Sequence, residues 1–382
     1  MNRPDYQNSI VNLMSSILGA FDCQNNYQPL NSLKVDLKKY KNIVCIVIDA
    51  LGHSFLSKQQ DSFLYQKMVG KLSSVFPTTT SSAVTSFLTA QAPLQHAMTG
   101  WYMYFKELAS AAVSLPFAPR FSKIPFDEMG VLGADIFNHE NAFDKNNIPY
   151  RVIFPNETIN SAYSKHSFNS PHKVAYEGHK DFFTTLETQI KDSANGANMI
   201  LAYYPFLDAT AHVYGINSPE AKDLFIKIDN KLNALIDQYA DGKTLFLITA
   251  DHGMVDVEPN KKLYVKDYPE ISDALILPLC GENRVPFCYV RPAEADAFES
   301  FMKNEFSQYC SILSQKEALD MQLFGVGEMN QKLIDRVGDY IIFMHENYVL
   351  LDPIYNEKPS NFVGFHGGLS DDELYVPLIS IG

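Results

Sequence analysis

Six acidic and imidazole side chains stand in short local patterns that could bind divalent cations. They are Asp49, Asp208, His212, Asp251, His252 and His366. Asp208 and His212, in "DATAH", are four residues apart, so on a helical turn both side chains would point the same way. Mixed carboxylate and imidazole donors suit Zn²⁺, with Mn²⁺ or Fe as alternatives. Two such ions can clamp the attacking and leaving oxygens of an in-line phosphoryl displacement. These residues therefore predict a two-metal site for phosphoryl chemistry.

A run of hydroxyl residues offers a nucleophile for this chemistry. The stretch "VFPTTTSSAVTSFLTA", residues 75–90, holds five Thr and three Ser. Such residues ordinarily cap helices and satisfy turns, but a hydroxyl held by a cation loses its proton more easily than a free one. The stretch also opens a predicted helix, whose first N–H groups would receive phosphate oxygens. One Thr is therefore a candidate nucleophile, and the other hydroxyl residues are candidate caps and small packing residues.

The elements that must position these residues form an α/β pattern. Short apolar runs alternate with helical segments, which predicts a mostly parallel central sheet with helices on both faces. The expected strands are residues 43–48, 72–76, 149–154, 198–204, 244–249 and 376–381, and helices are expected at 81–90, 180–192 and 219–239. Ligands bind such sheets at the carboxyl ends of the strands. Asp49, the hydroxyl run, Asp208 and the Asp251-His252 pair all follow predicted strands.

The length of the chain predicts more than one structural unit. With 382 residues it exceeds what one compact core usually holds. Residues 256–345 have the pattern of a smaller inserted α+β subdomain, a cap, which leaves 1–255 and 346–382 as the catalytic core. Residues 101–130 and 156–180 are rich in Pro, Ser and aromatics, and we expect them to be irregular surface excursions near the site.

Composition narrows the classes of partner. The net charge is −13, and no run of Lys and Arg exceeds two residues, which excludes a basic surface for nucleic acid. Bound cations would instead attract an anionic substrate locally. No apolar run approaches the roughly 18 residues of a transmembrane helix. The N-terminus has the pattern of a helix rather than a signal peptide. Five scattered Cys favour a reducing compartment. We expect a cytoplasmic protein, although a non-standard export route would leave no such mark, and the sequence predicts no oligomeric state.

Five motifs resemble, in order, those of one known family. "VIDALG", "FPTTTSSAVTSFLTA", "DATAHVYG", "TADHGM" and "GFHGG" lie within residues 43–368. The chain thereby resembles the alkaline phosphatase superfamily, specifically its type I phosphodiesterase/nucleotide pyrophosphatase branch. The resemblance implies an alkaline-phosphatase-like fold. It also implies a division of the metal ligands, with Asp49, Asp251, His252 and the nucleophilic Thr on one ion and Asp208, His212 and His366 on the other.

The same resemblance implies which Thr attacks. The family motif is P-T-x-T, with the nucleophile three residues after the Pro, so Pro77 points to Thr80, with Thr79 as the second choice. Nucleotide pyrophosphatases carry an Asn three residues after the nucleophile, which contacts a non-bridging phosphate oxygen. Here Ala83 occupies that position. The Ser81 N–H or the Thr85 hydroxyl are the candidates to replace it.

Each motif alone has a structural explanation. A strand-end Asp or an Asp-His-Gly is usually a turn, and an Asp and a His four residues apart are often a helix-surface pair. His166, His172 and His179 could form a third metal or phosphate site, but a solvated loop is the simpler interpretation. The aromatic residues Trp101, Tyr102, Tyr104 and Phe105 could stack on a substrate ring, although most such residues pack in cores. The joint pattern in family order favours function for the six ligand candidates.

These inferences predict a two-metal phosphodiesterase or nucleotide pyrophosphatase. Thr80 would attack phosphorus and form a covalent phosphothreonine that is then hydrolysed. The substrate would be a small phosphorylated molecule such as a nucleotide, a sugar nucleotide or a lipid head group. Two alternatives remain: a phosphomonoesterase or phosphonate hydrolase with the same site, and a non-catalytic member that only binds a phosphorylated ligand.

Overall fold

A seven-stranded, mostly parallel sheet forms the centre of the molecule. The computed structural model describes residues 2–122, 124–168, 173–193, 199–355, 357 and 361–382. The strand order is β2-β18-β9-β1-β8-β6-β7. The bounds are Met68–Ser73 for β2, Tyr375–Ile381 for β18, Thr244–Thr249 for β9, Asn42–Ile48 for β1, Met199–Tyr204 for β8, Tyr150–Pro155 for β6 and Lys173–Tyr176 for β7. Strands β9, β1, β8, β6 and β7 are parallel, whereas β18 runs antiparallel to both β9 and β2. The predicted α/β class is confirmed.

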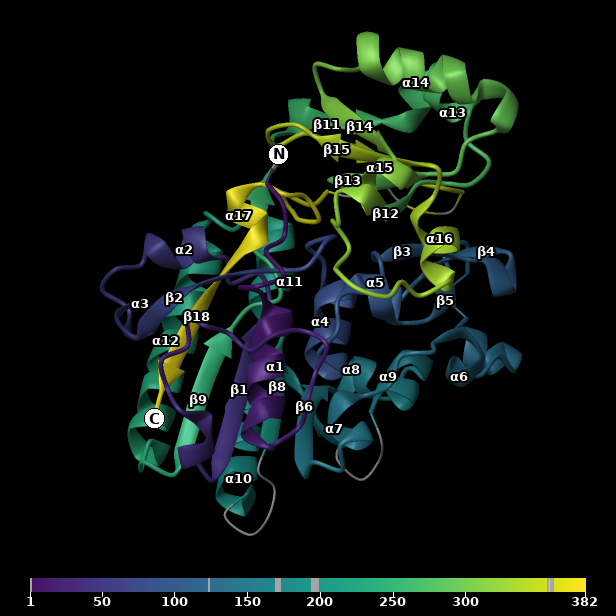
Figure 1. Cartoon of the computed structure of the whole chain (residues 1–382). Coiled ribbons are helices and arrows are strands. Elements are labelled where there is room, and N and C mark those ends of the chain that lie inside the picture. The colour runs from purple at the N-terminus through teal and green to yellow at the C-terminus, as the bar shows by residue number, and fades with distance from the viewer. Residues whose placement is uncertain (1, 123, 169–172, 194–198, 356, 358–360) are drawn as a thin grey trace.

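The inner strands are buried along their whole length because helices cover both faces of the sheet. Every residue of β1, β8 and β9 is buried, as expected for parallel strands packed on two sides. Figure 1 shows α1 (Ile10–Ala20) in front of the sheet, with α10 (Gly178–Ser193) and α12 (Pro219–Tyr239) behind it. Helix α12 has the predicted bounds, with Ser218 as its N-cap and Pro219 at its first position.

One predicted strand is displaced along the chain. Strand β2 ends at Ser73, three residues before the predicted end, and begins four residues before the predicted start. Its outer residues alternate between exposed and half-buried positions, so the edge strand lacks the apolar run that marks the inner strands. Phe76 has already left the sheet and lies between Phe324 and Phe343 in a second core.

That second core belongs to another seven-stranded sheet, of order β14-β15-β13-β12-β3-β4-β5. Its strands are Cys310–Ser314, Tyr340–Met344, Val285–Cys288, Cys280–Glu282, Tyr102–Phe105, Ser110–Val113 and Ala118–Pro119, in that order. Helix α14 (Ala295–Asn304) packs against it at the top of Figure 1. The sheet thus joins strands from 280–344 to strands from 102–119, a segment predicted to be irregular. The boundaries of the inserted subdomain, 256 and 345, stay a prediction.

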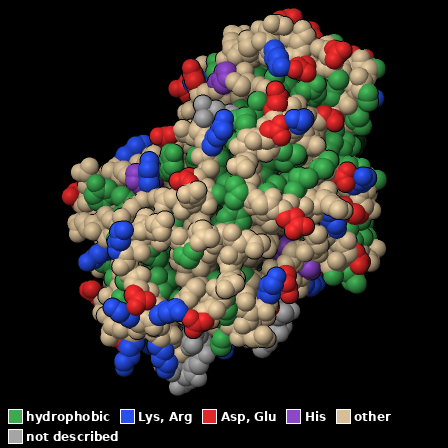
Figure 2. Space-filling view, in the orientation of Figure 1, with side chains coloured by type: hydrophobic (Ala, Val, Ile, Leu, Met, Phe, Trp, Pro, Cys, Tyr) green, Lys and Arg blue, Asp and Glu red, His purple; other side chains and the backbone are tan. Residues whose placement is uncertain are grey.

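Two short ladders form separate two-stranded sheets. Strand β10 (Val255–Asp256) pairs with β17 (Gly364–Phe365), and β11 (Lys262–Tyr264) pairs with β16 (Val349–Leu351). The first of these ladders holds residues 364–366 beside the segment that follows β9. Within the described residues, no helix is both long and apolar enough to cross a bilayer. Acidic and basic side chains are interspersed over the face shown in Figure 2.

Candidate active site

The carboxyl ends of three adjacent parallel strands supply most of the predicted ligands. Asp49 directly follows β1, and Asp251 and His252 follow β9 after a single residue. Helix α11 (Phe206–Tyr214) starts two residues after β8 and carries Asp208 and His212 one turn apart. Because neighbouring parallel strands end at one edge of the sheet, these side chains converge there.

The first group consists of Asp49, Asp251 and His252. One donor atom from each lies within 4.8 Å of the others. The His252 Nε2 is 3.4 Å from Asp49 Oδ1 and 3.5 Å from Asp251 Oδ2. All three side chains are buried. This grouping corresponds to the first ligand set that the resemblance implied.

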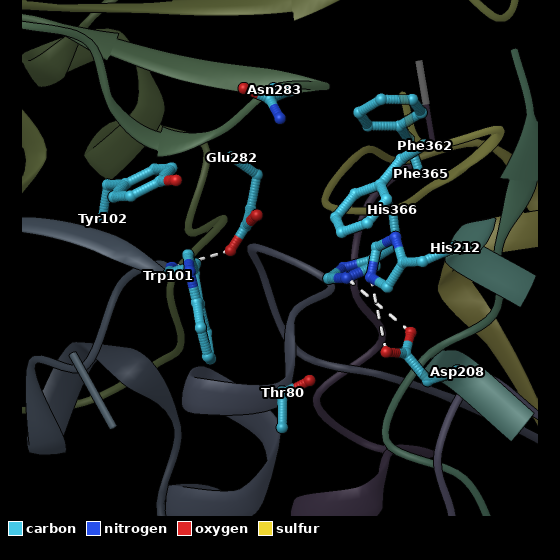
Figure 3. A pocket seen from close by; sticks show the side chains of 10 residues that line it. All are labelled: Thr80, Trp101, Tyr102, Asp208, His212, Glu282, Asn283, Phe362, Phe365 and His366. Carbon is cyan, nitrogen blue, oxygen red and sulfur yellow. Dashed lines mark hydrogen bonds and ion pairs between the residues drawn. The ribbon is translucent and has the colours of Figure 1, made fainter. Parts of the chain in front are cut away.

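A second group surrounds Asp208. Donor atoms of Asp208, His252 and His366 lie within 4.8 Å of one another, so His252 borders both groups. His212 Nε2 is 3.3 Å from Asp208 Oδ2, and His366 Nε2 is 3.9 Å from Asp208 Oδ1 (Figure 3). The rings of His252 and His366 stack with centroids 3.9 Å apart. All six predicted ligands therefore lie around one centre.

The three imidazoles are oriented by the backbone. The Nδ1 of His212 contacts Gly364 O at 2.8 Å, that of His252 contacts Gly253 O at 3.0 Å, and that of His366 contacts Thr78 O at 3.0 Å. A carbonyl partner requires a proton on Nδ1 and leaves the Nε2 lone pair free. Each Nε2 faces the carboxylates, which is the tautomer needed by a metal ligand.

Each carboxylate carries one buried oxygen atom that faces a histidine but has no hydrogen bond to a described residue. Among the described residues, buried oxygens of Asp49, Asp208 and Asp251 have no hydrogen-bond partner. Burial raises the pKa of Asp49 well above its usual value, and Asp208 and Asp251 add to that increase. Burial also raises the pKa of Asp208. Buried anionic oxygens are stable only when paired or bound to a cation, so this donor set fits two divalent ions.

At two positions of the site another chain segment approaches the backbone so closely that only glycine fits. A Cβ on Gly253 would lie 1.9 Å from the Asp372 carbonyl oxygen, which explains the Gly after Asp251-His252. Gly367 has φ +119°, and a Cβ there would lie 2.4 Å from the Cβ of Glu282. The "HGM" and "HGG" glycines thus bring other chain segments close to the histidines.

Thr80 lies at the start of α4 (Thr80–Thr89) and lines the cavity. Its Oγ1 is 3.4 Å from His252 Nε2. The Ala83 N–H makes the first bond within the helix, to Thr79 O. The N–H groups of Thr80, Ser81 and Ser82 precede that bond at the positive end of the helix, where anions bind favourably.

The other hydroxyls of the run have structural bonds. Thr78 Oγ1 donates to Gly368 O and accepts from Gly367 N–H, which ties the His366 loop to the helix start. Thr79 is buried and donates to Glu282 Oε1 at 2.5 Å. Thr85 Oγ1, a candidate for the phosphate contact, is buried, donates to Ser81 O and pairs with the Tyr163 hydroxyl. This arrangement favours Thr80 over Thr79 as the attacking group.

A cavity of about 420 Å³ opens above Thr80. Figure 3 shows Trp101 and Tyr102 on one side of it and Phe362 and Phe365 on the other. The stacking option for Trp101 and Tyr102 is therefore geometrically available. Tyr104 and Phe105 instead pack, against Tyr289 and Phe117 respectively.

Glu282 and Asn283 line the cavity between these aromatic walls, and the sequence analysis did not identify them. Glu282 is the last residue of β12, and Asn283 lies in the turn between β12 and β13 of the second sheet. Glu282 Oε1 accepts from the backbone N–H of Trp101 at 2.7 Å as well as from the Thr79 hydroxyl. Burial raises the pKa of Glu282 to about 7, against the effect of these two hydrogen bonds. The only signal in the sequence is a polar "GENR" between two apolar runs, which is typical of any exposed turn.

The same hairpin is anchored beside the site by a buried ion pair. Arg284 donates through Nε and Nη2 to the two carboxylate oxygens of Glu373 at 3.1 and 3.0 Å. Glu373 also accepts from the Gly368 N–H at 2.8 Å. The pair therefore links the turn that bears Glu282 to the segment that follows His366.

The remaining histidines do not form a third metal site among the described residues. His166 Nε2 contacts the His139 carbonyl, and His179 pairs with the Tyr204 hydroxyl. His172 lies outside the described residues.

Comparison with known proteins agrees with this geometry. The sequence model of the family "Type I phosphodiesterase / nucleotide pyrophosphatase" matches residues 43–369. No curated protein matches the chain in sequence. Murine ectonucleotide pyrophosphatase/phosphodiesterase 5 is similar in structure, with a TM-score of 0.68, 16% identity, and coverage of 89% of this chain and 88% of that chain. The human protein of that name gives the same four values.

A second kind of enzyme shares the fold. Phosphonoacetate hydrolase from Sinorhizobium meliloti, solved with phosphonoformate, has a TM-score of 0.62 and 17% identity, and the match covers 89% of each chain. An inactive variant of the murine protein, with a Thr replaced by Ala, was solved with AMP. At these identities the likeness establishes the fold.

Proposed function

Because the chain belongs to the type I phosphodiesterase/nucleotide pyrophosphatase family, we propose that it is a phosphodiesterase or nucleotide pyrophosphatase that depends on two divalent ions and uses Thr80 as nucleophile. Membership of the family supports a phosphoester hydrolase as the general activity. The observation that carries the finer proposal is the convergence of the six predicted ligands beside the Thr80 hydroxyl, which lines the cavity. The three imidazoles are oriented by backbone carbonyls, and each carboxylate has a buried oxygen without a hydrogen bond to a described residue.

The donor set divides between two ions in the proposal. Asp49, Asp251, His252 and Thr80 would hold one, and Asp208, His212 and His366 would hold the other, with zinc favoured by the mixed donors and manganese or iron as alternatives. When bound, such ions lower the pKa of a hydroxyl they hold and neutralise charge on the transferring group.

The protein's own groups supply the rest of the reaction. Thr80 Oγ1 gives up its proton and attacks phosphorus in line, a P–O ester bond breaks, and the leaving oxygen takes the electron pair of that bond and a proton to depart as the alcohol. A phosphothreonine forms, and water then cleaves the bond between phosphorus and Thr80 and restores the hydroxyl. The Ser81 and Ser82 N–H groups at the start of α4 are placed to receive a non-bridging oxygen. In this proposal the Ser81 N–H makes the phosphate contact that the family makes with an Asn at the position of Ala83.

The test compares two neighbouring threonines. Thr80→Ala should reduce turnover of bis-p-nitrophenyl phosphate by at least about 10³-fold, as expected for loss of a nucleophile. Thr79→Ala, the matched control, should keep most of the activity because its hydroxyl points to Glu282. Equal loss in both variants, or full activity in Thr80→Ala, would refute Thr80 as nucleophile.

Metal dependence is tested by chelation. Dialysis against EDTA should abolish turnover, and adding Zn²⁺ or Mn²⁺ should restore it. About two ions per chain without turnover of any ester would instead support the non-catalytic, ligand-binding alternative.

A further inference from the structure

We infer that Glu282 and the aromatic walls around it form a subsite for the organic group of the phosphoester, and that this subsite selects donor-bearing or cationic groups and rejects a second anion. The inference rests on the proposed function, because it assumes that phosphate lies at the six ligands. It goes further by naming the chemistry of what is attached to that phosphate.

Glu282 has one oxygen fixed and one available. Its Oε1 accepts from the Trp101 N–H and the Thr79 hydroxyl. Its second oxygen has no hydrogen bond or ion pair to any other described residue, and Figure 3 shows the carboxyl group facing the cavity. A carboxylate oxygen without a protein partner binds a donor on the ligand.

The position of Glu282 is built into the fold. Gly367 has no side chain where Glu282 approaches, and the next residue but one along the hairpin, Arg284, is held by the buried pair with Glu373. The carboxyl therefore cannot swing away into solvent as one on an exposed loop could. A rigid contact of this kind is what sets specificity in a binding pocket.

The charges around the cavity are one-sided. Its described lining residues include Asp208 and Glu282 but neither Lys nor Arg. Cationic side chains lie behind the walls, each with a partner in the chain. Arg284 pairs with Glu373, and Arg120 pairs with Glu357 and lies over the Tyr102 ring. Lys262 donates to the Phe362 carbonyl. An organic group with its own phosphate or carboxylate would meet Glu282, and no cationic side chain is among the described residues that line the cavity.

The aromatic side chains strengthen this selection. Trp101 and Tyr102 face Phe362 and Phe365 across the cavity (Figure 3). Ring faces attract ammonium groups and also stack on neutral rings. The combined chemistry fits an amino alcohol or a hydroxyl-rich alcohol such as a sugar, and it disfavours a carboxylate-bearing phosphonate.

The experiment uses four phosphate monoesters that share one phosphate and differ in a single terminal group: 2-aminoethyl, 2-hydroxyethyl, ethyl and carboxymethyl phosphate. Each has only one organic group, so that group is the one offered to the cavity. Binding is measured by calorimetry at pH 8 to full-length Thr80→Ala protein in Zn²⁺ buffer, which avoids turnover.

We expect aminoethyl phosphate to bind at least about 30-fold more tightly than carboxymethyl phosphate, with ethyl phosphate between them. Glu282→Gln, added to the same background, should reduce that ratio at least tenfold, since Gln still accepts from Thr79 and Trp101 but presents an N–H to the cavity. Glu258→Gln removes an exposed carboxylate that is not among the lining residues and is the matched control. It should leave the ratio unchanged.

The outcomes separate the two proposals. If none of the four esters binds, the proposed phosphate site itself fails. If all bind equally, or Glu282→Gln keeps the wild-type ratio of aminoethyl to carboxymethyl binding, the phosphate site stands and the subsite is refuted. Hydroxyethyl binding as tight as aminoethyl identifies a neutral polyol as the preferred group, and much tighter aminoethyl binding identifies a cationic one. Both outcomes support the inference. The relative affinities of the four esters for Thr80→Ala protein that retains Glu282 provide a test even if the Gln variant is unstable.

Discussion

The buried pair of Arg284 and Glu373 provides the most direct test of how the second sheet is held over the site. Arg284→Met keeps a long side chain but removes the charge and three hydrogen bonds, two to Glu373 and one from Nη1 to Tyr348 O at 2.6 Å. Glu373 would keep only its bonds from the Gly368 N–H and the Ser370 hydroxyl. One carboxylate would then be buried without its counter-charge.

The size of the effect follows from burial. The two side chains are 2% and 0% exposed, so solvent cannot screen the lone carboxylate. Removing one partner of a buried ion pair costs about 3–5 kcal/mol. An exposed pair is the matched control: Lys316 and Asp320 are 85% and 64% exposed, and Lys316→Met should cost less than about 1 kcal/mol.

The assay is urea denaturation, followed by circular dichroism and by the fluorescence of the single tryptophan, Trp101. Trp101 reports on the hairpin because its N–H bonds to Glu282. The double variant Arg284→Met/Glu373→Gln should recover a large part of the loss, since Gln removes the buried charge and keeps a hydrogen-bonding group.

The pH dependence has a definite sign. Burial alone would raise the pKa of Glu373, but Arg284 and the local donors hold it below its usual value. The pair therefore stabilises the fold above the ordinary carboxyl pKa, and this contribution is lost as pH falls through the lowered pKa of the folded state. The reasoning is refuted if Arg284→Met costs no more than Lys316→Met at pH 7, or if its cost is the same at pH 3.5.

Three further predictions concern the site itself. The pKa values of Asp49 and Asp208 are raised in the fold, so the metal-free protein should lose stability as pH rises above about 4. Thermal melts at pH 5 and 8 would show this loss, and Zn²⁺ should restore the stability. Gly367→Ala should cost more than about 1 kcal/mol in urea denaturation because of its positive φ and its contact with Glu282, whereas Gly70→Ala, with open space, should not. Burial raises the pKa of Glu282 to about 7, so preference for aminoethyl over ethyl phosphate should increase from pH 6 to 8, and a constant ratio in calorimetry would contradict this.

The convergence of most predicted ligand residues could be foreseen because they follow strong local signals. Apolar runs such as 43–48 and 244–249 are unmistakable as buried strands, and parallel strands end at a common edge. Once the strands were placed, Asp49 and Asp251 had to lie near one another. His366 was predicted from the order of the family motifs alone, because the two-residue strand β17 that precedes it is too short to show a periodic pattern.

The subsite was not predictable because nothing local marks it. Glu282 is about 200 residues from Thr80 in the chain and lies at a polar turn, where side chains ordinarily face solvent. It reaches the cavity only because β12 pairs with β3 at Gly281 and Tyr102, in a segment whose strands have four residues or fewer. Strands that short contain too few alternations to be distinguished from loops.

Helix geometry favours the Ser81 N–H over the Thr85 hydroxyl, but only once the first residue of the helix is known. Thr85 is five residues after Thr80, which rotates it by about 140° around the axis, away from the cavity. Its hydroxyl bonds inside the helix and to Tyr163, as this rotation requires. What the sequence left open was the first residue of α4, because the boundaries of helices and strands are the least reliable part of such predictions.

Two kinds of group in the site differ in what holds them, and this difference predicts how the site behaves without ions. The histidines are oriented by carbonyls of Gly364, Gly253 and Thr78, which belong to the β10–β17 ladder or lie beside it. Those bonds exist whether or not an ion is present. Asp49 and Asp251 each have one oxygen held by the chain, through the Tyr203 hydroxyl and the N–H groups of Ala50 and His252 respectively. The other oxygen of each is buried and has no hydrogen bond to a described residue. Metal loss should therefore destabilise the carboxylate side first while the imidazoles stay in place, so that ions rebind to a framework already formed rather than to one that must fold around them.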